Sequence, residues 1–228
     1  MDFPSSMQTR VFTHFFTLMA LSGAVAFAQS ASQSNTPAGK FYVADVEGVA
    51  EVSAGGKIED MKEKAVFDAE GTVLETKPDS TISVVMSNGV GLNFAPETKL
   101  VVKRFQQDPF QPNREDLETE PSISNTRVSL IRGAVGISTG KLVAGSSMVL
   151  ETPHGSLNVL SQTAQKVAIQ VSDTTTTVTV FAGAVTLRLD NMGSGETLTP
   201  GQQATIKRQG TGQLSSITVQ PTPKDLSP

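Results

Sequence analysis

The stretch NTRVSLIRGAVGISTG, residues 125–140, decides the fold of this chain. Apolar side chains alternate with polar ones before Gly133, at Val128 and Leu130, and alternate again after it, at Val135 and Ile137. Alternation with a period of two indicates a half-buried strand. A glycine inside such a run marks a bulge, a bend or a close approach of the backbone. The stretch therefore predicts two short strands joined at a corner.

The strand–glycine–strand pattern recurs along the chain. It returns around Gly183 in TTTTVTVFAGAVTLRL (174–189), around Gly89 in STISVVMSNGVGLNF (80–94), and around Gly48. The spacing of these glycines is too irregular for a strict repeat, and aromatic signatures of a propeller blade are missing. Val, Thr, Ser and Gly dominate a chain with no Trp and a single Tyr, which favours strands. We therefore expect an all-β fold in which these glycines form the corners of a sheet that coils on itself.

Three segments do not follow this pattern. Residues 57–70 predict irregular structure with one turn of helix, or alternatively an extended crossing held by Phe67. Residues 106–126 contain three prolines and five acidic residues, and we expect a long surface loop that is either merely solvated or binds a partner. Residues 208–228 predict a largely disordered tail, in which Ile217 and Val219 could add an edge strand.

The N-terminus predicts export. Residues 11–28 are mostly apolar and end in Ala26-Phe27-Ala28, the small-x-small pattern of a signal peptidase site. We expect a signal peptide over 1–28 with cleavage after Ala28, a polar linker over 29–39 and one domain over 40–207. The expected location is periplasmic or secreted, with no membrane span after cleavage. The alternative is an uncleaved membrane anchor, since 18 residues could just span a bilayer.

Composition excludes some partners and stabilising devices. The net charge of −4, without a basic cluster, gives no electrostatic footprint for nucleic acid. The chain has no cysteine, so disulfides are excluded and stability must come from packing.

Few side chains suggest chemistry. His154 lies in a Pro-His-Gly turn and is expected at the surface, without a second His or Cys to complete a zinc site. Ser156 lacks the strand-to-helix elbow that exposes a nucleophile. The densest carboxylates, Glu115, Asp116, Glu118 and Glu120, lack the spacing of a calcium loop. We therefore predict no catalytic residues, no cofactor and no metal site.

Five stretches, taken in order, resemble the FecR-type domain of bacterial envelope proteins. They are GVAEVSAGG (48–56), residues 71–102 with their "SNG" turn and "P-x-T-x-L" end, VSLIRGAVGIS (128–138), VLETPHGSLNV (149–159), and the closing pair of VTVFAGAVTL (178–187) with LTPGQQATI (198–206). The resemblance implies an all-β, twisted β-solenoid-like coil of short strands; a β-sandwich is the alternative. Residues 160–163 depart from the family's Gly-Thr pair, and the acidic loop is longer than the pattern needs.

The resemblance implies a function without catalysis. Family transducers also carry an anti-sigma segment and a receptor-docking segment, neither of which this sequence matches, so we expect a stand-alone exported member. The leading hypothesis is a protein of the bacterial envelope that binds a protein or glycan partner through its β surface. The alternative is a structural or assembly protein that associates through strand edges, for which an oligomer is possible. A third hypothesis, an enzyme acting on wall polymer, needs two carboxylates facing one cleft.

Overall fold

The computed structural model describes residues 37–111, 118–160, 162–189, 195–207 and 216–224. Contacts divide the chain into two units, residues 1–34 and 35–228. The first unit, with the predicted signal peptide and its cleavage site, lies outside the described residues, as does most of the predicted linker. Within the part that is described, no helix is long and apolar enough to cross a membrane.

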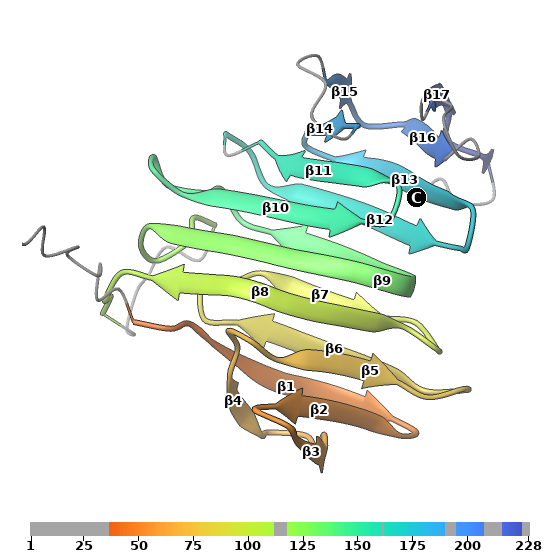
Figure 1. The fold of residues 1–228 in the computed structure, drawn as a ribbon. Coiled ribbons are helices and arrows are strands. Elements are labelled where there is room, and N and C mark those ends of the chain that lie inside the picture. The colour runs from red at the N-terminus through yellow and green to blue at the C-terminus, as the bar shows by residue number, and fades with distance from the viewer. Residues whose placement is uncertain (1–36, 112–117, 161, 190–194, 208–215, 225–228) are drawn as a thin grey trace, which may run out of the picture. The chain divides into compact units, whose positions relative to one another are not determined.

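The second unit consists of two β-sheets, and seventeen strands lie within its described residues. We call them sheet A and sheet B; in Figure 1 sheet A lies in front. The strands of sheet A are, in spatial order, β3 (Lys57–Asp60), β2 (Ala50–Ala54), β5 (Val73–Thr76), β8 (Lys99–Gln107), the first part of β9 (Ser124–Thr139), β10 (Ser147–Thr152), β11 (Gly155–Val159), β14 (Val185–Arg188) and β15 (Glu196–Leu198).

Sheet B contains the second part of β9. Its spatial order is β4 (Val66–Asp68), β1 (Lys40–Glu47), β6 (Thr81–Met86), β7 (Gly91–Phe94), then β9, β12 (Gln165–Val171), β13 (Thr175–Ala182), β16 (Gln202–Lys207) and β17 (Ser216–Pro221). All of these neighbours pair antiparallel, whereas in sheet A β9 and β10 pair parallel.

Strand β9 joins the two sheets at Gly133. Residues up to Arg132 pair with β8, and residues from Gly133 onward pair with β12 in the other sheet. Gly133 has φ +85°, in the left-handed region, and a Cβ at this position would overlap the backbone of Thr98. Only glycine combines this backbone angle with so close an approach. The corner predicted from the sequence at Gly133 is therefore confirmed.

Two further predicted glycine corners share this construction. At Gly48, Gly133 and Gly183 the chain passes between the sheets with positive φ. The amide of the following residue donates a hydrogen bond to a side chain from a nearby loop, or at Gly183 from the start of β12. The pairs are Val49 N to Ser80 Oγ (2.9 Å), Ala134 N to Thr98 Oγ1 (2.9 Å) and Ala184 N to Gln165 Oε1 (2.7 Å). Gly89 differs: it lies in the β6–β7 hairpin inside sheet B. The Ser-Asn-Gly sequence thus forms the turn it predicts, and grouping Gly89 with the corners is wrong.

The core lies between the inner faces of the two sheets. Inward side chains alternate with outward ones along the strands, as in β12, where Val167, Ile169 and Val171 are buried. One continuous cluster of buried apolar residues includes side chains from both sheets. Burial of this cluster supplies the stabilisation that disulfides do not provide.

Residues 57–70 differ from the preferred prediction. They form β3, which pairs with β2 across the Gly55-Gly56 turn, and β4, which pairs with β1. The extended alternative is the correct one, because the ring of Phe67 stacks on Phe41 at 5.3 Å and Met61 is buried. These tertiary contacts outweigh the short run of charged residues that suggested a helical turn.

The all-β class is confirmed. The chain crosses between the sheets at successive levels, as a coil requires, while the sheets pack face to face, as in a sandwich. At the C-terminal end the predicted edge strand around Ile217 and Val219 is β17, which pairs with β16.

Candidate functional surfaces

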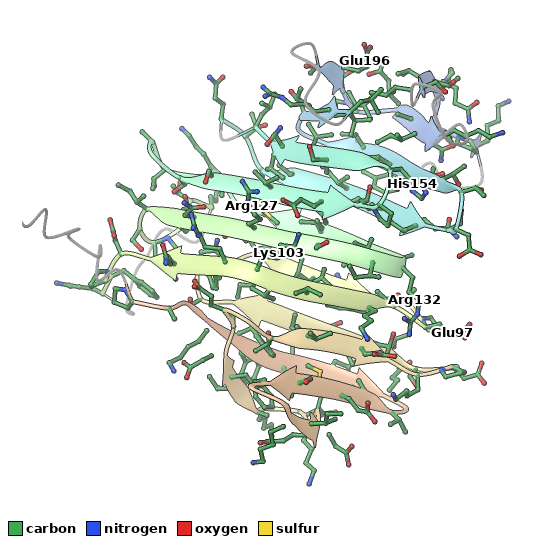
Figure 2. All side chains as sticks on the ribbon, viewed as in Figure 1. Glu97, Lys103, Arg127, Arg132, His154 and Glu196 are labelled. Atoms are coloured by element: carbon green, nitrogen blue, oxygen red, sulfur yellow. The ribbon has the colours of Figure 1, made fainter. Side chains whose placement is uncertain are left out.

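The outer face of sheet A contains two carboxylates, each held by two cations. Glu75 on β5 contacts Lys99 Nζ at 3.0 Å and Arg132 Nη2 at 2.7 Å. Glu151 on β10 contacts Lys103 Nζ at 2.5 Å and Arg127 Nη1 at 2.9 Å. Figure 2 shows Lys103 and Arg127 near the middle of this face, on the neighbouring strands β8 and β9, and Arg132 further along β9.

These cations lower the pKa of both carboxylates. A hydrogen bond from Lys99 is the main cause at Glu75, and Arg132 adds to it; partial burial opposes the shift. Lys103 acts in the same way at Glu151, with Arg127 adding to the lowering of its pKa. Both glutamates are therefore ionised at neutral pH, and their charge is already compensated by groups of the same sheet.

A shallow groove on this face brings two carboxylates together. Its volume is about 160 Å³, and Glu51 and Glu75 line it as direct cross-strand neighbours. Lys77 bonds Glu51 at 2.7 Å, so both carboxylates are ion-paired. A glycosidase needs one carboxylic acid with a raised pKa, whereas the pKa of Glu75 is lowered. Glu75 therefore lacks the property of the acid that the wall-polymer hypothesis requires.

The outer face of sheet B carries a row of uncharged residues. The row crosses seven strands in register, each residue opposite the next: Ser83, Asn93, Gly136, Ala168, Thr179, Gln203 and Gln220. Side-chain hydrogen bonds join neighbouring residues at each end of the row. At one end Ser83 Oγ donates to Asn93 Oδ1 at 2.7 Å. At the other end Gln220 Nε2 donates to Gln203 Oε1 at 3.0 Å, and Gln203 Nε2 donates to Thr179 Oγ1 at 2.9 Å.

The middle of this row is hollow, because Gly136 and Ala168 have no long side chain. A groove of about 220 Å³ lies here. Its lining residues are Asn93, Ala95, Ala134, Val135, Gly136, Ala168, Ile169, Gln170, Thr177, Thr179 and Gln203. None of these described lining residues is charged, in contrast to the groove on sheet A.

His154 is buried, so its predicted surface position is wrong. Its side chain is 3% exposed in the β10–β11 turn. Nδ1 lies 2.9 Å from Thr176 Oγ1, and Nε2 lies 3.3 Å from the carbonyl oxygen of Asp173. Both partners belong to sheet B or its β12–β13 turn, so the ring ties the two sheets together. Ser156 is not among its hydrogen-bond partners, which leaves no serine–histidine pair there.

Residues 108–111 and Glu118 of the acidic loop are exposed, as predicted for a surface loop, but Glu120 is anchored in the domain. Glu120 is 3% exposed; its Oε2 accepts a hydrogen bond from Ser124 Oγ at 2.7 Å and its Oε1 accepts one from Val143 N at 2.8 Å. Strands β8 and β9 also extend to Gln107 and from Ser124, so the loop is shorter than 106–126. Glu115 and Asp116 lie outside the described residues. Among those described, no cluster of three or more His, Cys, Asp or Glu could hold a metal ion.

Two stacked β-sheets with one shared core define an all-β domain. The sequence matches the FecR protein family over residues 72–186. This span covers half of the chain, and the protein belongs to the FecR family. The family points to a regulatory rather than a catalytic kind of protein, and its members are associated with the cell envelope.

Two solved structures are also similar. Both are crystal structures described as a candidate anti-sigma factor from Parabacteroides distasonis, with 13% and 12% identity and TM-scores of 0.46 and 0.45. Each match covers 65% of this chain and 59% of the other chain. These likenesses are too distant to add to the family assignment. The comparison with curated protein sequences found no match.

The sequence located the β surface but not the groove within it. Apart from Ala95, which directly follows β7, the lining residues come from five strands that are far apart in the chain, and only the register of sheet B brings them together. The one available signal was the outward alternation of Thr175, Thr177 and Thr179, which marks a polar strand face without showing what lies beside it.

Proposed function

We propose that this chain is a non-catalytic, exported FecR-family protein of the bacterial envelope that binds a partner through the outer face of sheet B. The observation that carries the proposal is the uncharged groove over Gly136 and Ala168. Gln170 and Thr177 line it, and neither side chain is bonded to a described residue. Side chains of this kind are free to bond a partner without first breaking contacts within the domain.

The charged face supports this choice by contrast. On sheet A, Glu75 and Glu151 are each held by two cations of the same face. A partner that docked there would have to break these ion pairs or desolvate them, and desolvation offsets much of what a new charged contact gains. The groove on the outer face of sheet B is lined by uncharged residues, so a partner that binds there breaks no ion pair.

The test is retention of envelope components on the immobilised full chain, compared with an Ala168→Arg variant. An arginine at position 168 fills the groove with a long charged side chain but leaves the core unchanged, because Ala168 faces outward. We expect the variant to lose the specific retained material. A Ser156→Arg variant on the outer face of sheet A is the matched control and should retain it. Equal retention by all three proteins contradicts the proposal.

Export is supported by the signal-like sequence of residues 1–28 and by the envelope association of the family. Fractionation of cells that express the full chain, followed by N-terminal sequencing, tests it. A mature N-terminus at Gln29 in the periplasm or medium agrees with the proposal. A chain that keeps Met1 and stays in the cytoplasm contradicts it.

A second candidate function, assembly through strand edges, rests on an asymmetry between the two ends of the sheets. At one end β3 and β4 carry charges, including the Lys57–Glu59 and Lys40–Asp68 ion pairs. At the other end β15 of sheet A carries Glu196, whereas β17, the last described strand of sheet B, is Ser-Ile-Thr-Val-Gln-Pro and contains no charged residue. Charged edges resist pairing with other chains, whereas uncharged edges permit it. Light scattering over a wide concentration range tests this function. A molar mass that grows with protein concentration supports assembly, and a constant monomer mass excludes it.

A further inference from the structure

The groove on sheet B also indicates the chemical class of the partner, an inference that rests on the proposed function. We propose that this groove takes a neutral carbohydrate, with one ring seated over Gly136 and Ala168 and the rest of the chain continuing along the uncharged row. Four features favour such a ligand: the buried donors of the groove, its lack of charge, its apolar floor and the paired backbone around it.

Two buried polar side chains at the groove have hydrogen-bonding capacity left over. Thr179 is 4% exposed and Gln203 is 7% exposed, although both lie on the outer face. Thr179 Oγ1 accepts a hydrogen bond from Gln203 Nε2, but its own hydroxyl proton reaches no acceptor among the described residues. The amide of Gln203 uses one of its two protons in this bond. Because a buried donor without an acceptor is destabilising, such donors favour a ligand oxygen.

The opposite side of the groove also offers unused groups. Asn93 Oδ1 is bonded by Ser83, but Asn93 Nδ2 donates to no described residue. Gln170 and Thr177 complete the lining with a free amide and a free hydroxyl. Together these groups supply both donors and acceptors. A sugar hydroxyl is both donor and acceptor, so it fits a mixed set of amides and hydroxyls.

The absence of charge in the lining selects against ionic ligands. None of the described lining residues is charged. A phosphate, carboxylate or ammonium group placed here would be partly desolvated without a counter-charge, which is costly. The cations that hold Glu75 and Glu151 lie on sheet A and do not reach this face. Charge complementarity therefore points to a neutral ligand.

The floor of the groove is mainly apolar. It consists of small side chains, Ala134 and Ala168, and the backbone of Gly136, with Val135 and Ile169 beneath. A pyranose ring has an apolar face of C–H groups and a polar rim of hydroxyls. Such a ring can lay its apolar face on the floor while its rim reaches the amides and hydroxyls at the sides. The volume of about 220 Å³ is below that of typical drug-sized pockets, so it suits one ring of a longer chain.

An extended peptide fits this site less well. Peptides that add to a sheet bind through free backbone groups at an edge. The strands under the groove, β9, β12 and β13, are paired on both sides within sheet B, so their backbone groups are already used. A peptide would meet only side chains, and its own amides would lose water without regular partners. A polyhydroxyl chain does not have this requirement.

The experiment is a titration of the isotope-labelled full chain followed by NMR. The probes are chitotetraose and maltotetraose as neutral sugars, polygalacturonate as an anionic sugar, and an uncharged Ser/Gln-rich peptide. We expect a neutral sugar to shift the amide signals of residues 136, 168, 170, 177 and 179 in a saturable way. The signals of Glu75 and Glu151 on sheet A should stay fixed.

Three variants check the site. Gln170→Ala combined with Thr177→Ala removes two free groups and should weaken binding about tenfold, as expected for the loss of roughly one to two hydrogen bonds. Ala168→Arg should abolish binding. Asn158→Ala, the matched amide on sheet A, should leave it within about twofold.

The outcomes for the sugar and for the retained envelope material can be told apart. If no neutral sugar shifts the groove signals, or if Ala168→Arg does not change the binding, the carbohydrate inference is overturned. It is also overturned if only polygalacturonate or the peptide binds. Should the Ala168→Arg variant still lose retained envelope protein in that case, the proposed binding face stands and its partner is a protein. If Ala168→Arg changes neither sugar binding nor retention, both proposals are overturned.

Discussion

Sheet A and sheet B share one core and one central strand, yet their outer faces differ in what their side chains bond to. On sheet A the long charged side chains bond one another: Glu75 and Glu151 each hold two cations. On sheet B the residues that line the groove are uncharged, and several of their polar groups bond nothing within the described chain. A face whose side chains bond one another stabilises the domain and resists docking. A face whose polar side chains lack partners within the domain is available for recognition.

This difference has a backbone origin in β9. The same strand presents Arg127, Ser129 and Arg132 on sheet A and Ala134, Gly136 and Ser138 on sheet B. The corner at Gly133 separates the two sets. Cross-strand neighbours then extend the pattern: β8 and β10 add Lys103 and Glu151 on one face, while β7 and β12 add Asn93 and Ala168 on the other. Substitutions at the corner, at the tie between the sheets and on each face should therefore differ widely in their effects.

The largest effect is expected at the corner that separates the faces. Gly133→Ala forces a side chain into the left-handed region, which costs about 1–2 kcal/mol, and also drives its Cβ into the backbone of Thr98. We expect a loss of about 3 kcal/mol or more in the free energy of unfolding. Urea denaturation followed by circular dichroism measures it.

The control for this corner is Gly55→Ala. Gly55 also has positive φ, at +56°, but a Cβ there meets nothing within 4 Å. Its substitution should cost only about 1 kcal/mol, the backbone part of the effect. Equal losses for the two variants would show that the close approach at Thr98 is unimportant.

The next effect is expected at the tie between the sheets. His154→Ala removes a buried ring that bonds Thr176 and the Asp173 carbonyl, and leaves a cavity between two turns. We expect a loss of about 2–3 kcal/mol in the free energy of unfolding. Hydrogen exchange should become faster in both the β10–β11 and β12–β13 hairpins. Faster exchange in one hairpin only would mean that the ring does not couple the sheets.

A smaller, pH-dependent effect is expected on sheet A. Glu151→Gln removes a carboxylate bonded to Lys103 and Arg127, and partly exposed pairs of this kind contribute at most about 1 kcal/mol. The folded-state pKa of Glu151 is lowered, so its contribution is fully present above the unfolded value of about 4.3 and is lost as pH falls towards the folded pKa.

The wild-type chain should therefore exceed the Gln variant in stability at pH 7, and the difference should vanish once the pH has fallen below the lowered folded-state pKa of Glu151. Glu196→Gln is the control, since Glu196 on β15 is exposed and has no ion pair among the described residues. Unfolding midpoints measured against pH should be the same for this control as for the wild type. A Glu151 difference that persists at low pH would contradict the ion-pair explanation.

The smallest effect on stability is expected on sheet B. Gln170→Ala and Thr177→Ala remove side chains that bond nothing in the described domain, so the free energy of unfolding should change by less than about 0.5 kcal/mol. The same changes should weaken partner binding. A large loss of stability would show that these groups serve the fold, and the functional contrast between the faces would then fail.

The sequence by itself determined the all-β class, most strand positions and the corners at Gly48, Gly133 and Gly183. These follow from local rules, because alternation places side chains on opposite faces and glycine alone accepts the backbone angle that a tight corner needs. The tertiary structure decided the rest. Residues 57–70 became strands because Phe67 stacks on Phe41, and His154 became buried because Thr176 lies across from it.

The groove was also decided by tertiary structure alone. Asn93, Gly136, Ala168 and Thr179 are neighbours only through the register of four strands, and register depends on pairings between distant segments. In the sequence Gly136 and Ala168 are ordinary small residues in strands. Packed side by side in the sheet, they form the floor of a groove. A small residue leaves a hollow only where side chains of neighbouring strands surround it, and strand pairing decides which neighbours these are.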